Sequence, residues 1–155
     1  MSQAELTVKK SVTVDVPIAH AFEVFTKRFD LWWPRAHHIG KVDMKEAIME
    51  PREGGRWYEK GVDGSECDWG KVLSWSPPNK GALSWHLQGD FSYNPDPAHA
   101  SRVEVTFTEE AGKTRVELVH SGLERAIAGE RLRDSVNAEG GWATLLELFA
   151  RAAAA

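Results

Sequence analysis

The sequence contains little cysteine, little tyrosine and no long apolar run. Its single cysteine, Cys67, excludes an internal disulfide and is typical of a protein kept in a reducing compartment. No stretch reaches the ~18 consecutive apolar residues of a membrane-spanning helix. Residues 1–6 lack the apolar core of a signal peptide. These absences predict a cytoplasmic protein without a membrane span.

Clustered positive charge is also missing. The chain has 19 Lys and Arg against 23 Asp and Glu, and its basic residues are scattered among acidic ones. Because nucleic-acid binding usually requires a basic patch, we expect no nucleic-acid partner. The sequence also lacks the G-x-G-x-x-G and Walker patterns of nucleotide sites, and the C-x-x-C and H-E-x-x-H patterns of metal sites. We therefore expect no cofactor and no bound metal.

Tryptophan, in contrast, is abundant, with seven residues in a chain of 155. Hydrophobic residues make up 42% and charged residues 27% of the sequence, which is ordinary for a globular protein. The length fits a single domain, residues 1–155, with a sizeable core. The many large, flat side chains indicate an aromatic lining around an apolar interior.

The last stretch of the chain, residues 130–153, predicts one long helix that is apolar over about half of its circumference. The apolar positions are Leu132, Val136, Trp142, Ala143, Leu145, Leu146 and Phe149. Such a wide apolar arc predicts that the preceding strand-rich segment curves around the helix. We interpret Gly140 and Gly141 as a place where another segment approaches the helix closely. A break of the helix at this point is the alternative.

The rest of the chain predicts one strand, one or two helices and then six more strands. Residues 6–16 alternate with period two, residues 18–29 carry a helical apolar repeat, and residues 30–33 suggest a further short turn of helix. The six later strands are expected at residues 45–50, 56–60, 67–75, 82–88, 102–108 and 114–120. Since short turns join these strands, they should pair antiparallel.

Several short motifs spread over nearly the whole chain resemble a known family. They are residues 14–17 (VDVP), 21–25 (AFEVF), 50–59 (EPREGGRWYE), 63–66 (DGSE), 69–73 (WGKVL), 76–78 (SPP), 120–123 (HSGL), and Gly141-Trp142 with Leu145. The chain resembles the START/Bet v 1-like (SRPBCC) superfamily, in the branch named after the C-terminal domain of the activator of heat-shock-protein-90 ATPase. The resemblance implies an α+β helix-grip fold, with a seven-stranded antiparallel sheet curved around a long C-terminal helix. It also implies a cavity for a hydrophobic ligand between sheet and helix.

Candidate ligand-binding residues combine aromatic side chains with a few polar ones. The aromatic candidates are Trp32, Trp33, Tyr58, Trp69, Trp85 and Trp142, and the polar candidates are His120, Arg131, Ser135 and Glu139. On a continuous last helix, Arg131, Ser135 and Glu139 project onto the same side as Trp142, where they would orient a polar part of the ligand. The alternative is that this half of the helix extends past the sheet into water. We expect residues 131–139 to face the ligand and residues 142–149 to anchor the sheet. Residues 89–100 form the longest irregular loop and are long enough to cover a cavity.

Three functions are compatible with these features. The first is binding of a hydrophobic or aromatic small molecule in the cavity. The second is a cyclase- or hydrolase-like enzyme, in which His120 and Glu139 would act as an acid–base pair. The third is a co-chaperone-like protein-binding module, which the resemblance suggests and which an exposed apolar patch would indicate. A homodimer is possible because edge strands and tryptophans are available at the surface.

Overall fold

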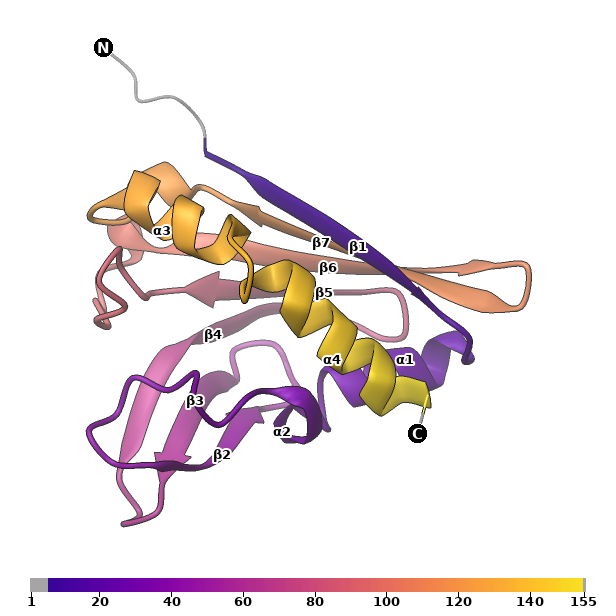
Figure 1. Ribbon diagram of the computed structural model, residues 1–155, viewed down its shortest axis with the longest axis horizontal. Helices are drawn as coiled ribbons and strands as arrows, with labels where there is room; N and C mark the ends of the chain where they lie inside the picture. The colour runs from indigo at the N-terminus through magenta and orange to yellow at the C-terminus, as the bar shows by residue number, and fades with distance from the viewer. Residues whose placement is uncertain (1–5, 155) are drawn as a thin grey trace.

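Seven strands form a single antiparallel sheet in the computed structural model, which describes residues 6–154 (Figure 1). The strands are β1 (Val8–Val14), β2 (Met44–Met49), β3 (Arg56–Gly61), β4 (Glu66–Ser76), β5 (Lys80–Trp85), β6 (Ser101–Glu110) and β7 (Lys113–Ser121). Their order across the sheet is β1-β7-β6-β5-β4-β3-β2, and every pair is antiparallel. The predicted α+β helix-grip architecture is confirmed.

The alternation of apolar and polar residues explains why these strands share one buried face. In β6, Val103, Val105 and Phe107 are buried at every second position. Opposite them in β7, Val116 pairs with Phe107 and Leu118 pairs with Val105. Because side chains alternate across a strand, this pairing places a continuous apolar layer on the inner face.

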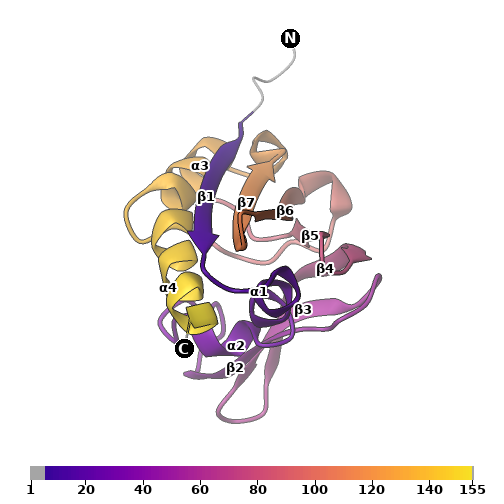
Figure 2. The same ribbon diagram turned by 90° about the vertical axis from the view of Figure 1, so that its right-hand side faces the viewer.

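Helices fill the concave side of the sheet. They are α1 (Ile18–Phe25), α2 (Phe29–Trp32), α3 (Gly129–Asn137) and α4 (Trp142–Ala154). A 3₁₀ turn, η1 (Pro97–His99), lies between β5 and β6, and a second one, η2 (Leu123–Arg125), lies between β7 and α3. Figure 2 shows the strands curling from β1 round to β2, with α4 on the open side between them. Phe149 of α4 is fully buried, and its ring lies 5.2 Å from that of Phe25 and 5.7 Å from that of Trp32. None of the helices in residues 6–154 is long and apolar enough to cross a membrane.

The predicted single helix over residues 130–153 is wrong, because the chain breaks between α3 and α4. Gly140 has a φ of +90°, a left-handed conformation that L side chains rarely adopt. A Cβ at Gly141 would lie 2.2 Å from the carbonyl oxygen of Val136, so only glycine fits there. The Gly141 N–H donates to the Ala138 carbonyl oxygen, and α4 starts afresh as the Leu145 N–H donates to the Gly141 oxygen. The two glycines therefore end one helix and start another in a different direction.

Candidate functional site

A cavity of about 480 Å³ lies where the break between α3 and α4 faces the sheet. Four tryptophans form its walls: Trp33, Trp69, Trp85 and Trp142. They come from four parts of the chain, namely the segment after α2, β4, β5 and the start of α4. Their ring centroids form a chain of contacts, with 5.3 Å between Trp33 and Trp69, 6.1 Å between Trp33 and Trp142, and 5.8 Å between Trp85 and Trp142. A connected set of tryptophan rings therefore forms part of the cavity wall, and aliphatic side chains such as Leu87, Val136 and Leu145 complete it.

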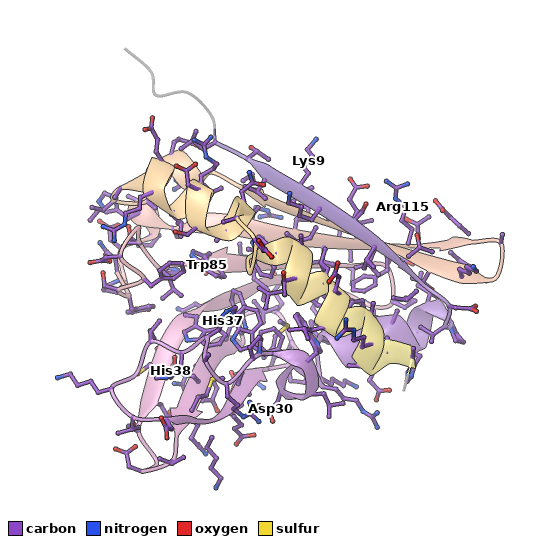
Figure 3. The ribbon with its side chains drawn as sticks, viewed as in Figure 1. Lys9, Asp30, His37, His38, Trp85 and Arg115 are labelled. Carbon is purple, nitrogen blue, oxygen red and sulfur yellow. The ribbon has the colours of Figure 1, made fainter. Side chains whose placement is uncertain are left out.

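The polar lining side chains come from two segments of the chain, which we together call the rim. The rim consists of His37 and His38 from the loop after α2, and Ser135 and Glu139 from α3 and the residues just after it. Figure 3 shows Trp85 on the sheet side and His37 on the loop opposite. His37 is exposed at the surface, and partial desolvation lowers the pKa of its imidazole, which favours the neutral form at pH 7. Phe91, from the loop between β5 and β6, also lines the cavity, so that loop contributes to its wall.

Hydrogen bonds to the protein fix three of the four wall tryptophans. The indole N–H of Trp33 donates to the His37 carbonyl oxygen at 2.9 Å. The Trp69 indole donates to Glu59 Oε1 at 3.0 Å, and the Trp142 indole donates to His120 Nδ1 at 3.0 Å. Trp85 differs, because its buried Nε1 has no hydrogen-bond partner among the described residues. A buried donor without a partner costs roughly 1–3 kcal/mol of stability.

Glu59 connects the loop after α2 to Trp69 of β4 through hydrogen bonds. Its side chain is buried, with 1% exposed, and follows Trp57 by two residues on the inner face of β3. Oε1 accepts the Ile39 N–H at 2.6 Å as well as the Trp69 indole, and Oε2 accepts the Gly40 N–H at 3.2 Å. Three N–H donors thus replace the water that a buried carboxylate loses. Glu59 therefore positions both the rim loop and the indole of Trp69.

His120 lies behind the wall formed by Trp142. Its side chain is fully buried on β7, as the alternation with Val116 and Leu118 predicts. Since Nδ1 accepts the Trp142 indole proton, Nε2 carries the ring proton and donates to Ser101 Oγ at 2.8 Å. Burial lowers the pKa of His120 to about 3, because the apolar surroundings disfavour the charged imidazolium. His120 is therefore neutral and orients a wall residue.

The low pKa of His120 makes the stability of the protein depend on pH. Between its unfolded pKa of 6.5 and its native pKa of about 3, the unfolded state binds one more proton, so stability falls as pH decreases. His120→Gln keeps an acceptor for Trp142 and a donor for Ser101 but does not titrate. We expect the wild type to lose about 2 kcal/mol more than this variant between pH 7 and pH 5 in urea denaturation. Parallel pH profiles for the two proteins would contradict a buried neutral histidine.

The structure brings together some of the sequence-predicted site residues and separates others. Trp33, Trp69, Trp85, Trp142, Ser135 and Glu139 line the cavity. Trp32 lies in the core, where its indole donates to the Val24 carbonyl oxygen. Tyr58 lies on the opposite face of β3 from Glu59, with Arg56 Cζ 3.9 Å from its ring centroid. Arg131 is exposed on α3, one helical turn before Ser135, and does not line the cavity.

Sequence reasoning did not single out Glu59, His37, His38 or Phe91 as site residues. Glu59 had a detectable signal, since it shares the inward parity of Trp57 in β3. The other three lie in irregular loops, where no periodicity in the sequence indicates which way a side chain points.

Among the described residues, no cluster of three or more His, Cys, Asp or Glu side chains could hold a metal ion. Burial, and secondarily the charge of Glu59, raises the pKa of the Cys67 thiol, which argues against a reactive thiolate.

The curved sheet, the packed α4 helix and the internal cavity together define an α+β domain of the helix-grip class. The sequence profile of the family described as "Activator of Hsp90 ATPase homolog 1-like protein" matches residues 15–154. The chain belongs to this family.

Solved structures similar to this chain include a synthase and a resistance protein. An anthrahydroquino-gamma-pyrone synthase, Txn09, solved as a complex with a ligand designated SUM, is 37% identical, with a TM-score of 0.67 over 95% of this chain and 96% of that one. The self-sacrificing resistance protein CalC from Micromonospora echinospora is 29% identical, with a TM-score of 0.67 over 96% and 94%. The protein MLL2253 from Mesorhizobium loti, 19% identical with a TM-score of 0.68 over 94% and 95%, shares the fold. A search of curated proteins finds no match.

Proposed function

We propose that this protein binds a flat, largely apolar aromatic molecule in the tryptophan-walled cavity. The observation that carries the proposal is the set of four tryptophans around about 480 Å³ of space. This volume lies within the range of small-molecule sites, and such sites are mostly apolar with a few convergent polar groups. Indole rings favour offset or edge-to-face contact with other aromatic rings, so a planar ligand gains more here than an aliphatic one.

Similarity to known structures supports the same class of ligand. The synthase that is 37% identical carries in its name a fused polycyclic aromatic, an anthrahydroquinone joined to a γ-pyrone. The two chains cover each other almost completely, so the comparison includes every element that builds the cavity. A molecule of this general shape, with fused rings and few charges, fits between walls made of tryptophan faces and edges.

Titration calorimetry tests the proposal directly. The probes are 9-fluorenone and xanthone, which are flat tricyclic ketones, with dodecanoate as an aliphatic control. At a ligand efficiency of about 0.5 kcal/mol per heavy atom, a tricyclic ketone should bind with a Kd on the order of 10 µM. We expect both ketones to bind with one-to-one stoichiometry and dodecanoate to bind at least tenfold more weakly. Absence of heat and of tryptophan quenching with all three probes would overturn the proposal.

A ring-closing enzyme that uses the same cavity is the second candidate, because the 37% identical relative is named a synthase. Both ring nitrogens of His120 already bind Trp142 and Ser101, so a pair of His120 with Glu139 is poorly placed to act on a ligand. The better candidates for proton transfer line the rim itself. His37 is neutral at pH 7 and can accept a proton, and Glu139 lies on the α3 side of the same cavity.

A further inference from the structure

The turn that follows β5 holds Phe91 at the cavity in an unusual backbone conformation. Phe91 lines the cavity, is 38% exposed and has a φ of +63°, in the left-handed region. A bulky residue rarely adopts a positive φ, because its Cβ crowds the neighbouring carbonyl oxygen. Strained residues of this kind cluster at ligand-binding sites, where the surrounding structure imposes the strain. The conformation of Phe91 therefore calls for a specific explanation.

Hydrogen bonds within the turn impose this conformation. The Phe91 N–H donates to the Gln88 carbonyl oxygen at 2.8 Å, and the Gln88 N–H donates to the Ser92 carbonyl oxygen at 2.9 Å. Asp90 Oδ1 accepts the Ser92 N–H at 2.9 Å and the Ser92 hydroxyl at 2.6 Å. None of these bonds uses the side chain of Phe91, and glycine would adopt the same φ without strain. The turn itself therefore does not require a phenyl ring at residue 91.

The turn is also attached to the segment that precedes α3. The Gly89 N–H donates to the Ile127 carbonyl oxygen at 2.8 Å, and the Ile127 N–H donates to Gln88 Oε1 at 2.6 Å. The two backbones lie so close that a Cβ on Gly89 would be 2.5 Å from the Ala128 carbonyl oxygen. Since α3 follows directly and contributes to the lining, the turn is fixed relative to another part of the cavity wall.

Tyr93, two residues further along the same loop, provides an internal comparison. Tyr93 is also 38% exposed, but it does not line the cavity, and its ring centroid lies 5.6 Å from that of His86. Its ring therefore packs within the protein. Phe91 and Tyr93 match in loop, size and exposure, and they differ in whether they reach the cavity.

We infer that the ring of Phe91 contacts the bound ligand and helps the cavity to select flat aromatic molecules. This inference rests on the proposed function and deepens it, because it adds an aromatic contact from a loop to the four tryptophans of the walls. A phenyl ring gains more from an aromatic ligand than from an aliphatic chain, since two aromatic rings attract each other beyond the burial of their surfaces. The strained backbone at residue 91 is retained because the ring serves binding.

Calorimetric titration of 9-fluorenone into three variants tests this contact. Phe91→Ala removes the ring, Phe91→Gly removes the ring and the strain, and Tyr93→Ala is the control from the same loop. We expect the Kd to rise about fivefold in both Phe91 variants, the size of one aromatic contact, and to change less than about twofold in Tyr93→Ala. Dodecanoate, which cannot stack, should weaken less than about twofold in the Phe91 variants.

Urea denaturation of the two Phe91 variants tests the strain separately. Alanine keeps the Cβ that a positive φ disfavours, and glycine does not. The midpoint for Phe91→Gly should therefore lie about 0.5 M above that for Phe91→Ala. Equal midpoints would show that residue 91 is not strained and would overturn the inference.

A further readout uses the wild type alone and does not depend on any variant folding. Intermolecular nuclear Overhauser effects should connect the protons of 9-fluorenone with the ring of Phe91 and not with that of Tyr93. Unchanged affinity in both Phe91 variants, an equal loss in Tyr93→Ala, or no Overhauser contact to the Phe91 ring overturns the inference. If the wild type still binds 9-fluorenone in that case, the proposed function stands. If the wild type does not bind it, the inference and the proposed function both fail.

Discussion

Replacing Glu59 with alanine is expected to lower the free energy of unfolding by about 3 kcal/mol or more. The reason is that the Ile39 N–H, the Gly40 N–H and the Trp69 indole would all lose their acceptor. A buried donor without a partner costs roughly 1–3 kcal/mol. Glu59→Gln keeps the shape and one acceptor oxygen, so it should cost less. Urea denaturation measures the stability, and amide hydrogen exchange at Ile39 and Gly40 reports on the rim loop.

A surface carboxylate supplies the control for this prediction. Glu66 forms an exposed ion pair with Arg56 at 3.0 Å in the same half of the sheet. Exposed pairs typically contribute between 0.2 and about 1 kcal/mol. We therefore expect Glu66→Ala to change the free energy of unfolding by less than about 1 kcal/mol and to leave the amide exchange rate of Ile39 unchanged. Equal effects of Glu59→Ala and Glu66→Ala would show that Glu59 does not anchor the cavity.

Filling the cavity from its rim is expected to lower the affinity for 9-fluorenone by about tenfold or more, which corresponds to ~1.4 kcal/mol. Ser135→Trp places a large ring at an exposed position of α3 that lines the cavity. Asp134→Trp adds the same ring to the neighbouring exposed position, which does not line the cavity. Because both sites are exposed, stability should change by no more than about 0.5 kcal/mol in either variant.

Calorimetric titration of the two variants distinguishes a cavity site from a surface site. Loss of affinity in Ser135→Trp with unchanged affinity in Asp134→Trp is the expected pattern. Equal affinity in both variants would place the ligand elsewhere on the protein. Ala36→Trp fills the cavity independently from the loop after α2, since Ala36 is also exposed and lines the cavity. We expect it to lower the affinity as Ser135→Trp does.

The strands and the antiparallel pairing of consecutive strands could be predicted because each strand carries its own signal. The alternation of Val103, Val105 and Phe107 identifies β6, and the short turn at residues 111–112 requires β6 and β7 to pair antiparallel. The inward direction of His120 also follows from strand parity, and its burial agrees. Such local patterns predict the structure because successive side chains of a strand point to opposite faces of the sheet. A period of two in the sequence therefore becomes one buried face.

The cavity was harder to predict because its geometry depends on contacts between distant segments. Arg131 was placed toward the ligand because it shares a helix face with Ser135, but it lies one turn earlier in α3 and outside the cavity lining. The single helix that was predicted to carry both residues and Trp142 breaks at Gly140 and Gly141. Glu59 acts through Ile39 and Gly40, about twenty residues earlier in the chain, and no periodic pattern links them. Likewise, nothing in the sequence distinguishes the unpaired indole of Trp85 from that of Trp142, since only the fold supplies His120 to the latter.

The most direct test of the central claim is the set of indole N–H resonances in a ¹H–¹⁵N spectrum of the wild type titrated with 9-fluorenone. The claim is that a flat aromatic molecule, here 9-fluorenone, occupies the cavity walled by Trp33, Trp69, Trp85 and Trp142. Its ring current should shift these four resonances most, while Trp75, which is outside the lining, should stay nearly constant. No saturable shift in the four wall indoles, or a larger shift at Trp75 than at the walls, would contradict the claim.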